Sequence, residues 1–328
     1  MSSEETAQNR PGRKRLGSIL RIVFSIAILA FILSRVGLSE VLARLADVNP
    51  WLYGLGALVY LSSVLIRAAR WRVMLRPMDI DVGLFELARL YLLGFFWDTF
   101  LPSGFGGDVV KAIELSRRSS QTEQAVTSVV AERLVGLLGT SLIALVVVLI
   151  PPMLVPLWVL AVIGGVSLAI LVGGALLRAD LLDWLADHLP FLRRVTGHKT
   201  VRKFDAALKA YDMRTIAAGV LTSLPFTGAL VLVNYLLGLS LGMDIPIAYY
   251  LVFVPVVSIV NLLPLSFNGI GVREYMYNLL FGTIVGVGAG QPVALAILFN
   301  ILRIGVGLLG GVISLIRGTR DLVEQASP

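Results

Sequence analysis

The sequence contains no cysteine and only two histidines, His188 and His198, which lie in one polar segment. The absence of cysteine excludes disulfide bonds and thiolate chemistry, and two histidines give little basis for a metal cluster. The chain also lacks a G-x-x-x-x-G-K-[ST] phosphate-binding loop, which argues against ATP as a direct energy source. We therefore expect neither a cofactor nor a bound metal.

Charged residues are scarce as well: they make up 15% of the chain, whereas hydrophobic residues make up 57%, and the mean hydropathy is +0.85. Because about a quarter of the residues in soluble domains are charged, this composition predicts an integral membrane protein built from helices. A net charge of +7 is also typical of nucleic-acid binding. The basic residues follow the ends of apolar stretches instead, which indicates membrane topology and no nucleic-acid partner.

Six apolar stretches approach the roughly 20 residues that a bilayer crossing requires. The first follows a basic tail, residues 1–15, and we interpret it as an uncleaved anchor, since no convincing small-residue cleavage site follows it. Arg67 and Arg70 end the second stretch and are expected to anchor in the cytoplasmic headgroups. The expected spans are 16–33, 50–66, 125–150, 157–177, 215–241 and 292–316.

These spans predict a single membrane domain at 16–316 in the cell membrane, followed by a tail at 317–328. The positive-inside rule places both termini in the cytoplasm. Residues 178–214 mix basic residues and aspartates with leucines and a tryptophan, which favours cytoplasmic amphipathic helices near the headgroups. A solvated linker is the alternative for this segment.

Two glycine-containing motifs, at 101–111 and 263–273, share the pattern L-P-x-x-F-x-G-x-x-V-[KR]. Each interrupts an apolar stretch, and a break inside a membrane is tolerated only where the backbone is buried in protein or lines water. We therefore predict two re-entrant helical hairpins, in repeats 84–150 and 247–316 of inverted orientation. Two full crossings at the second motif fit the charge distribution equally well.

Four motifs occur in a characteristic order: R-x-x-R-W-x-x-M-L at 67–75, L-P-S-G-x-G-G-D at 101–108, A-E-R-L-x-G-L-L at 131–138 and N-G-I-G-x-R-E at 268–274. Together they resemble the flippase-like membrane domain of the lysylphosphatidylglycerol synthase family, over nearly all of the apolar chain. In fused members a soluble transferase domain makes the lipid, and the membrane domain is associated with moving it between leaflets. Without that transferase, the resemblance implies lipid translocation, not aminoacylation, and a separate lipid-modifying enzyme as a possible partner.

The residues around both motifs suit an anionic headgroup. Glycines permit turns and close approach of the backbone to a ligand, and a helix that starts after each loop would direct free N–H groups at a phosphate. We expect the arginines to contact phosphate and the glutamates to hold them or relay protons, because charges inside a membrane usually face the protein interior. The candidate substrate-binding residues are Gly104, Gly106, Gly107, Asp108, Lys111, Glu132, Arg133, Asn268, Gly269, Gly271, Arg273, Glu274 and Arg303.

Structural roles compete with this interpretation. Asp108 and Asn268 are typical helix caps, and Lys111 and Glu114 are spaced to form an interfacial ion pair. The membrane arginines have neighbouring acids as possible structural partners.

A lipid translocase that binds membrane lipids at a midplane site between inverted repeats is the function favoured by these features. Its energy would come from an ion gradient, or the transport would run downhill. The alternative is a membrane enzyme that acts on a lipid or polyprenyl-phosphate headgroup through Asp98, Asp108 or Glu132 and a divalent cation. A third possibility is a scaffold for other envelope proteins.

Overall fold

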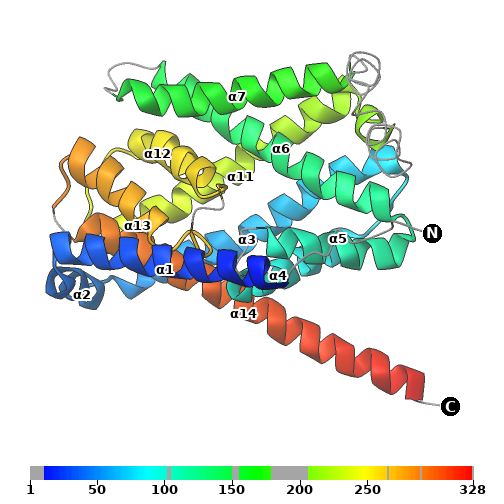
Figure 1. Cartoon of the computed structure of the whole chain (residues 1–328), viewed down its shortest axis with the longest axis horizontal. Coiled ribbons are helices and arrows are strands. Elements are labelled where there is room, and N and C mark those ends of the chain that lie inside the picture. The colour runs from blue at the N-terminus through cyan, green and yellow to red at the C-terminus, as the bar shows by residue number, and fades with distance from the viewer. Residues whose placement is uncertain are drawn as a thin grey trace, which may run out of the picture.

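The computed structural model consists of helices joined by short connections (Figure 1), with no β-strand among the described residues. Five helices of the described chain are long and apolar enough to cross a bilayer, which confirms the prediction of an all-α polytopic membrane protein. They are α3 (Pro50–Leu75), α6 (Thr122–Val148), α7 (Leu157–Arg178), α11 (Met213–Ser240) and α14 (Gln291–Ala326). The described residues are 11–101, 105–149, 155–178, 206–263, 266–288 and 290–326.

The N-terminal region forms a bent pair of helices, α1 (Pro11–Val36) and α2 (Leu38–Ala46). They meet at 85° around Gly37, whose φ of 92° lies in a region that glycine adopts at little steric cost. If this pair is one span, the described chain has up to six candidate spans, the number expected from the sequence. The first ten residues and most of the segment 178–214 lie outside the described residues.

The first glycine motif connects two antiparallel helices, α4 (Leu84–Phe100) and α5 (Gly106–Ser119). Glu86 near the start of α4 forms an ion pair of 2.9 Å with Arg118 near the end of α5. The outer ends of the two helices therefore lie side by side, and the motif forms the tip of a hairpin. This arrangement matches the predicted helical hairpin.

Close backbone packing joins the two arms of this hairpin. Gly107 in α5 faces Gly94 in α4 so closely that a Cβ atom on Gly107 would collide with the Gly94 carbonyl oxygen and lie 2.8 Å from Cγ of Asp98. A Cβ atom on Gly106 would lie 2.6 Å from the side chain of Leu101. Both glycines thus serve helix packing, a role that the sequence-based interpretation had not assigned to them.

We expect Gly107→Ala to lower the free energy of unfolding by about 1–3 kcal/mol, because the added methyl group overpacks the hairpin. Thermal unfolding of the detergent-solubilised variant measures this effect. Gly165→Ala in α7 is the matched control, since a Cβ atom there meets nothing within 4 Å, and it should be as stable as the parent or more so. Equal stability of Gly107→Ala and the parent would contradict the packing role.

The second hairpin consists of α12 (Ile247–Val260) and a returning arm, α13 (Val272–Tyr277) followed by the π-helical turn η3 (Asn278–Ile284). The rings of Tyr250, near the start of α12, and Phe281, in η3, are 4.8 Å apart, so these two arms are also antiparallel. The 14 residues of α12 rise about 21 Å, less than the roughly 30 Å of a hydrocarbon core. This length favours a re-entrant hairpin over two full crossings.

The two hairpins have matching neighbours. The first arm α4 packs against α14 and its second arm α5 packs against α6, whereas α12 packs against α6 and α13 against α14. In each half the first arm therefore contacts the long helix of the other half, and the second arm contacts the long helix that follows it. This exchange of partners is the packing expected of an internal repeat. The far end of α14 projects beyond the other helices (Figure 1).

The tips of the hairpins meet inside the molecule. The side-chain amide of Asn268 donates a hydrogen bond of 2.7 Å to the main-chain oxygen of Asp98, which lies in the last turn of α4, just before the first tip. The main-chain N–H of Phe267 donates to the hydroxyl of Ser25 in α1 at 2.6 Å. The two motifs, far apart in sequence, are thus brought together.

Candidate functional site

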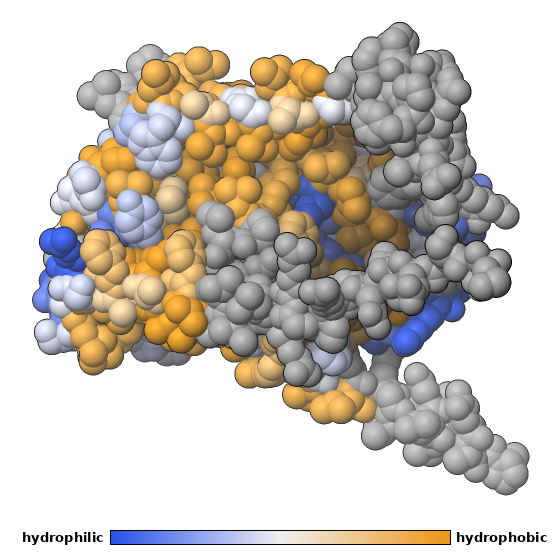
Figure 2. Space-filling model, viewed as in Figure 1, coloured by the Kyte–Doolittle hydropathy of each residue, from blue (hydrophilic) through white to orange (hydrophobic). Residues whose placement is uncertain are grey.

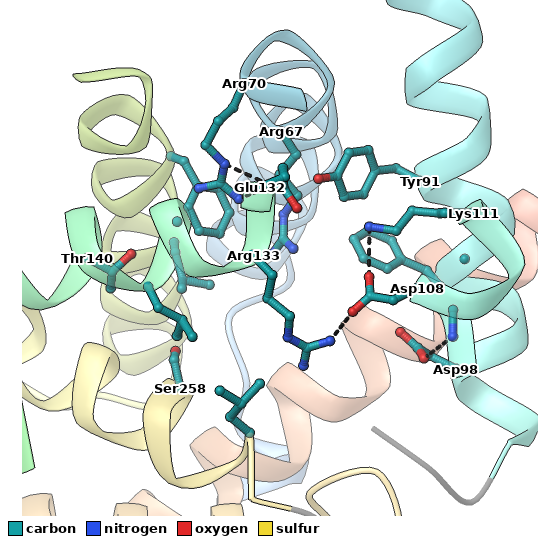
Figure 3. A pocket seen from close by; sticks show the side chains of 18 residues that line it. Arg67, Arg70, Tyr91, Asp98, Asp108, Lys111, Glu132, Arg133, Thr140 and Ser258 are labelled. Atoms are coloured by element: carbon teal, nitrogen blue, oxygen red, sulfur yellow. Dashed lines mark hydrogen bonds and ion pairs between the residues drawn. The ribbon is translucent and has the colours of Figure 1, made fainter. Parts of the chain in front are cut away.

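A polar cavity of about 230 Å³ lies where the first hairpin meets α3, α6, α11 and the end of α12 (Figure 3). Since one water molecule occupies about 30 Å³ of liquid, this volume accommodates a small anionic group together with several waters. Figure 2 shows a hollow on this side of the molecule, with hydrophilic atoms at depth among hydrophobic ones. The charged residues that line the cavity are Arg67, Arg70, Asp98, Asp108, Lys111, Glu132 and Arg133.

A buried ion pair forms one wall of the cavity. Arg70 of α3 and Glu132 of α6 are each only 4% exposed, and Nε of Arg70 donates to Oε1 of Glu132 at 2.8 Å. Nη1 of Arg70 also reaches the hydroxyl of Ser223 at 3.3 Å. The guanidinium lies over Gly136, where a Cβ atom would come within 2.7 Å of it, so a larger residue at this position would have to displace the Arg70 side chain. Glu132 therefore holds Arg70, not the adjacent Arg133.

The expectation that Arg70 anchors in the headgroups is wrong. We had expected the second span to stop at residue 66, but α3 continues through the basic cluster to Leu75. Residues 67–75 contain no helix breaker, and the first proline follows at position 77. This extension brings Arg70 into the protein interior, where it faces α6.

A second acid in the cavity, Asp108, bridges two basic residues. Its Oδ1 atom accepts an ion pair of 2.8 Å from Nζ of Lys111, and its Oδ2 atom accepts one from Arg133 (Figure 3). The Lys111 side chain is 6% exposed and its ammonium lies 4.1 Å from the ring centroid of Tyr91, whereas the Arg133 side chain is 28% exposed. Lys111 is thus fixed in the wall, and Arg133 lies at the rim.

These contacts correct two structural alternatives. Asp108 is not the N-cap of α5, which is Phe105; it is the third residue of the helix, and its carboxylate pairs with Lys111 and Arg133. The expected ion pair between Lys111 and Glu114 is also wrong, since Glu114 pairs with Arg117 at 2.9 Å.

Carboxylates, and not free N–H groups, occupy the helix starts that follow the two motifs. The N–H of Gly107 donates to Oδ1 of Asp98 at 2.6 Å, and the N–H of Gly271 donates to Oε2 of Glu274 at 2.6 Å. Contrary to our expectation, these two N–H groups are therefore not available to a phosphate, which a carboxylate would also repel. Gly104 lies outside the described residues.

Arg67 differs from the other cations of the cavity. Its guanidinium lies 4.3 Å from the ring centroid of Phe226 and 5.2 Å from that of Phe95, and it points into the space that Arg133 borders (Figure 3). Its Nε atom is buried and has no hydrogen-bond partner. Within the described part of the chain, no ion pair joins Arg67 to an acid.

The formal charges of the lining leave a positive excess. Four basic and three acidic residues border the cavity. Glu132 neutralises Arg70, Asp108 lies between Lys111 and Arg133, and Asp98 accepts the N–H of Gly107. The arrangement therefore suits an added anion and places Arg67 beside it.

The three cavity carboxylates are the ones that the enzyme alternative would use with a divalent cation, and each is bonded to a different group. Asp98, Asp108 and Glu132 bind a main-chain N–H, a lysine with an arginine, and an arginine, respectively. Among the described residues, no group of three or more histidine, aspartate or glutamate side chains is arranged to hold a metal ion.

Arg273 and Glu274, at the end of the second motif, do not line the cavity. Arg273 donates to Oδ1 of Asn300 in α14, and the amide nitrogen of Asn300 donates to Oε1 of Glu274 at 2.6 Å. Arg273 and Glu274 are 8% and 2% exposed. The polar network therefore holds α13 against α14.

Arg303 and Asn268 fix the second tip. Nη1 of Arg303 donates to Oδ1 of Asn268 at 2.6 Å, and Nη2 donates to its main-chain oxygen at 3.2 Å. Asn268 has a positive φ of 55°, and Gly269 and Gly271 have φ values of 82° and 85°. The structure thus brings Gly107, Asp108, Lys111, Glu132 and Arg133 together at the cavity and places the candidates of the second motif in a neighbouring network.

Arg67 and Arg70 are the functional candidates that sequence reasoning missed. Their spacing of three residues puts them on one helical face, a signal that was present in the sequence. Their place in a basic cluster at the end of an apolar stretch favoured the headgroups instead.

Comparison with known proteins agrees with this architecture. The family model described as the lysylphosphatidylglycerol synthase TM region matches residues 18–311, which contain both hairpins and the cavity. The chain is similar to UPF0104 membrane protein PH1989 of Pyrococcus horikoshii, with 23% identity over 94% of this chain and 99% of that protein. Because the family model covers most of its length, the chain belongs to the family of the lysylphosphatidylglycerol synthase transmembrane region.

Proposed function

We propose that the protein moves a polar lipid with a phosphate-bearing headgroup between membrane leaflets, and that the headgroup occupies the cavity beside the first hairpin. The observation that carries this proposal is Arg67, a cation without a carboxylate partner that points into the cavity. A charge inside a membrane costs about 2.5–3.5 kcal/mol on insertion scales, so such a residue usually has a partner or a function. A phosphate supplies the missing negative charge.

Asp108 and Arg133 supply an exchangeable contact for that phosphate. Arg133 is the more exposed of the two cations on Asp108, whereas Lys111 is held in the wall by burial and by Tyr91. A phosphate that binds Arg133 leaves Asp108 paired with Lys111. Entry and release of the headgroup then exchange one ion pair of Arg133 for another, and Asp108 keeps a basic partner throughout.

In this proposal the two hairpin tips, which contact each other, are the part of the protein that moves during translocation. Translocation requires the cavity to open alternately to the two leaflets, as in transporters with inverted repeats. The hydrogen bond between Asn268 and Asp98 joins the tips, and Arg303 holds Asn268. In this proposal both hairpins are re-entrant from opposite faces of the cell membrane, both termini are cytoplasmic, and a separate enzyme modifies the transported lipid.

A fluorescence assay in vesicles tests the proposal. The protein is reconstituted into phosphatidylcholine vesicles that contain a trace of phosphatidylglycerol with a nitrobenzoxadiazole group on one acyl chain. Dithionite added outside bleaches only the outer leaflet unless lipid crosses the membrane. We expect vesicles with the protein to lose nearly all fluorescence and protein-free vesicles to keep the inner-leaflet share; protection of that share in both would overturn the proposal for this class of lipid.

A further inference from the structure

An apolar groove of about 480 Å³ runs between α5 and α6 on the outside of the polar cavity. It is lined mainly by aliphatic side chains of both helices, and several of them are exposed: Val109 is 55% exposed and Ile113 is 46% exposed. Val130 and Leu134 contribute the α6 side and are 38% and 40% exposed. An apolar, exposed groove of this kind fits a hydrocarbon chain.

The groove and the polar cavity share a wall. Asp108, Arg133, Leu137 and Leu262 line both of them. At this wall the Arg133 guanidinium lies 4.4 Å from the ring centroid of Phe105, which itself lines the groove. The ion pair between Arg133 and Asp108 is therefore the boundary between an apolar and a polar compartment.

Ordinary contact with membrane lipid does not explain why the apolar groove adjoins the polar cavity. Exposed aliphatic residues also occur on α7, where Leu168 and Val172 are 62% and 46% exposed, but neither of them lines the polar cavity. Only an amphiphile makes use of an apolar groove and a positively charged cavity that meet at one ion pair. Its chain remains in the hydrocarbon while its anionic group reaches Arg67.

We propose that one hydrocarbon chain of an anionic lipid binds in the groove between α5 and α6, and that its phosphate enters the cavity sideways past Arg133 and Asp108. This inference rests on the proposed function for the identity of the cavity's ligand. It adds the chain-binding site, the lateral direction of entry and the role of the ion pair as the passage between the two compartments.

Photo-crosslinking tests this site directly. The protein is placed in phosphatidylcholine nanodiscs that contain phosphatidylglycerol with a diazirine on one acyl chain, and the crosslinked peptides are identified by mass spectrometry. We expect labelling of α5 and α6 to exceed that of α7 several-fold. Excess unlabelled phosphatidylglycerol should abolish this difference. If inorganic phosphate at millimolar concentration abolishes it equally, the cavity binds free phosphate and the lipid assignment is overturned.

Two tryptophan variants separate groove binding from general lipid contact. Val130→Trp fills the groove and should reduce both the labelling of α5 and α6 and the rate of lipid translocation several-fold. Val172→Trp makes the same change on an exposed side of α7, outside the groove, and should leave both unchanged. Thermal unfolding of both variants confirms that they fold.

The outcomes distinguish the two proposals. Equal labelling of α5, α6 and α7 in a protein that translocates lipid overturns the groove and keeps the proposed function. Selective labelling without translocation supports the binding site and overturns the translocase. Selective labelling that is unchanged in Arg67→Gln shows a chain bound without its phosphate in the cavity, and so overturns the linked site.

Discussion

Arg67→Gln is expected to lower the rate of lipid translocation by about tenfold to a hundredfold. Hydrogen bonds to charged groups contribute about 1.5–3 kcal/mol, and each 1.4 kcal/mol corresponds to a factor of ten. Glutamine keeps an N–H donor, on a shorter side chain, but removes the charge that lacks a carboxylate partner in the cavity. The dithionite assay with labelled phosphatidylglycerol measures the change, and Arg67→Lys should retain part of the activity.

Arg72→Gln is the matched control for this experiment. Arg72 lies on the same helix, but its side chain is 47% exposed and contacts Asp81 at 3.4 Å, outside the cavity. We expect this variant to translocate lipid at the parental rate. A parental rate in Arg67→Gln would refute the assignment of Arg67 to the headgroup, and loss of thermal stability in Arg67→Gln would indicate a structural role.

Glu132→Gln is expected to destabilise the protein by about 3–5 kcal/mol, the usual effect of removing one partner from a buried ion pair. Arg70 would then be a buried cation without a carboxylate partner, with the hydroxyl of Ser223 and the ring of Phe226 beside it. Unfolding in mixed micelles of increasing denaturing-detergent content measures the change in free energy.

Two further variants define the origin of that effect. Glu114→Gln removes an acid from an exposed ion pair with Arg117 and should cost less than about 1 kcal/mol. In the double variant Arg70→Met with Glu132→Gln, the lone buried cation is absent, and stability should recover in part. If Glu132→Gln alone is as stable as the parent, the ion pair with Arg70 does not stabilise the fold.

The membrane spans and the hairpins were accessible from the sequence because hydropathy and the positions of glycine and proline are local properties. The interruption of the apolar stretches near Gly107 and Gly271 predicted the two hairpins, and both are present. The end of α3 was misplaced because the basic residues Arg67 and Arg70 were taken to mark the headgroups. Charge alone does not end a helix, and a membrane protein can bury an arginine that has an acidic partner.

The residues of the candidate site could be predicted only in part from the sequence. Asp108, Lys111, Glu132 and Arg133 were chosen from their charge in apolar surroundings, and the structure places all four at one cavity. Arg273 and its neighbours had the same sequence signal but lie in a separate network. The sequence does not distinguish a charge that lines a cavity from one that fixes a loop, because both are buried and both have polar neighbours.

The sequence by itself determined the class of the protein, its helices and its paired glycine motifs, since these follow from composition and from short-range spacing. The tertiary structure alone decided which charges neutralise each other. Glu132 pairs with Arg70, which is 62 positions away in the sequence, and not with the adjacent Arg133. Arg133 pairs instead with Asp108, 25 positions away. Ion pairing depends on the separation of side chains from different helices, and Arg67 remains without an acid only because packing directs every nearby carboxylate elsewhere.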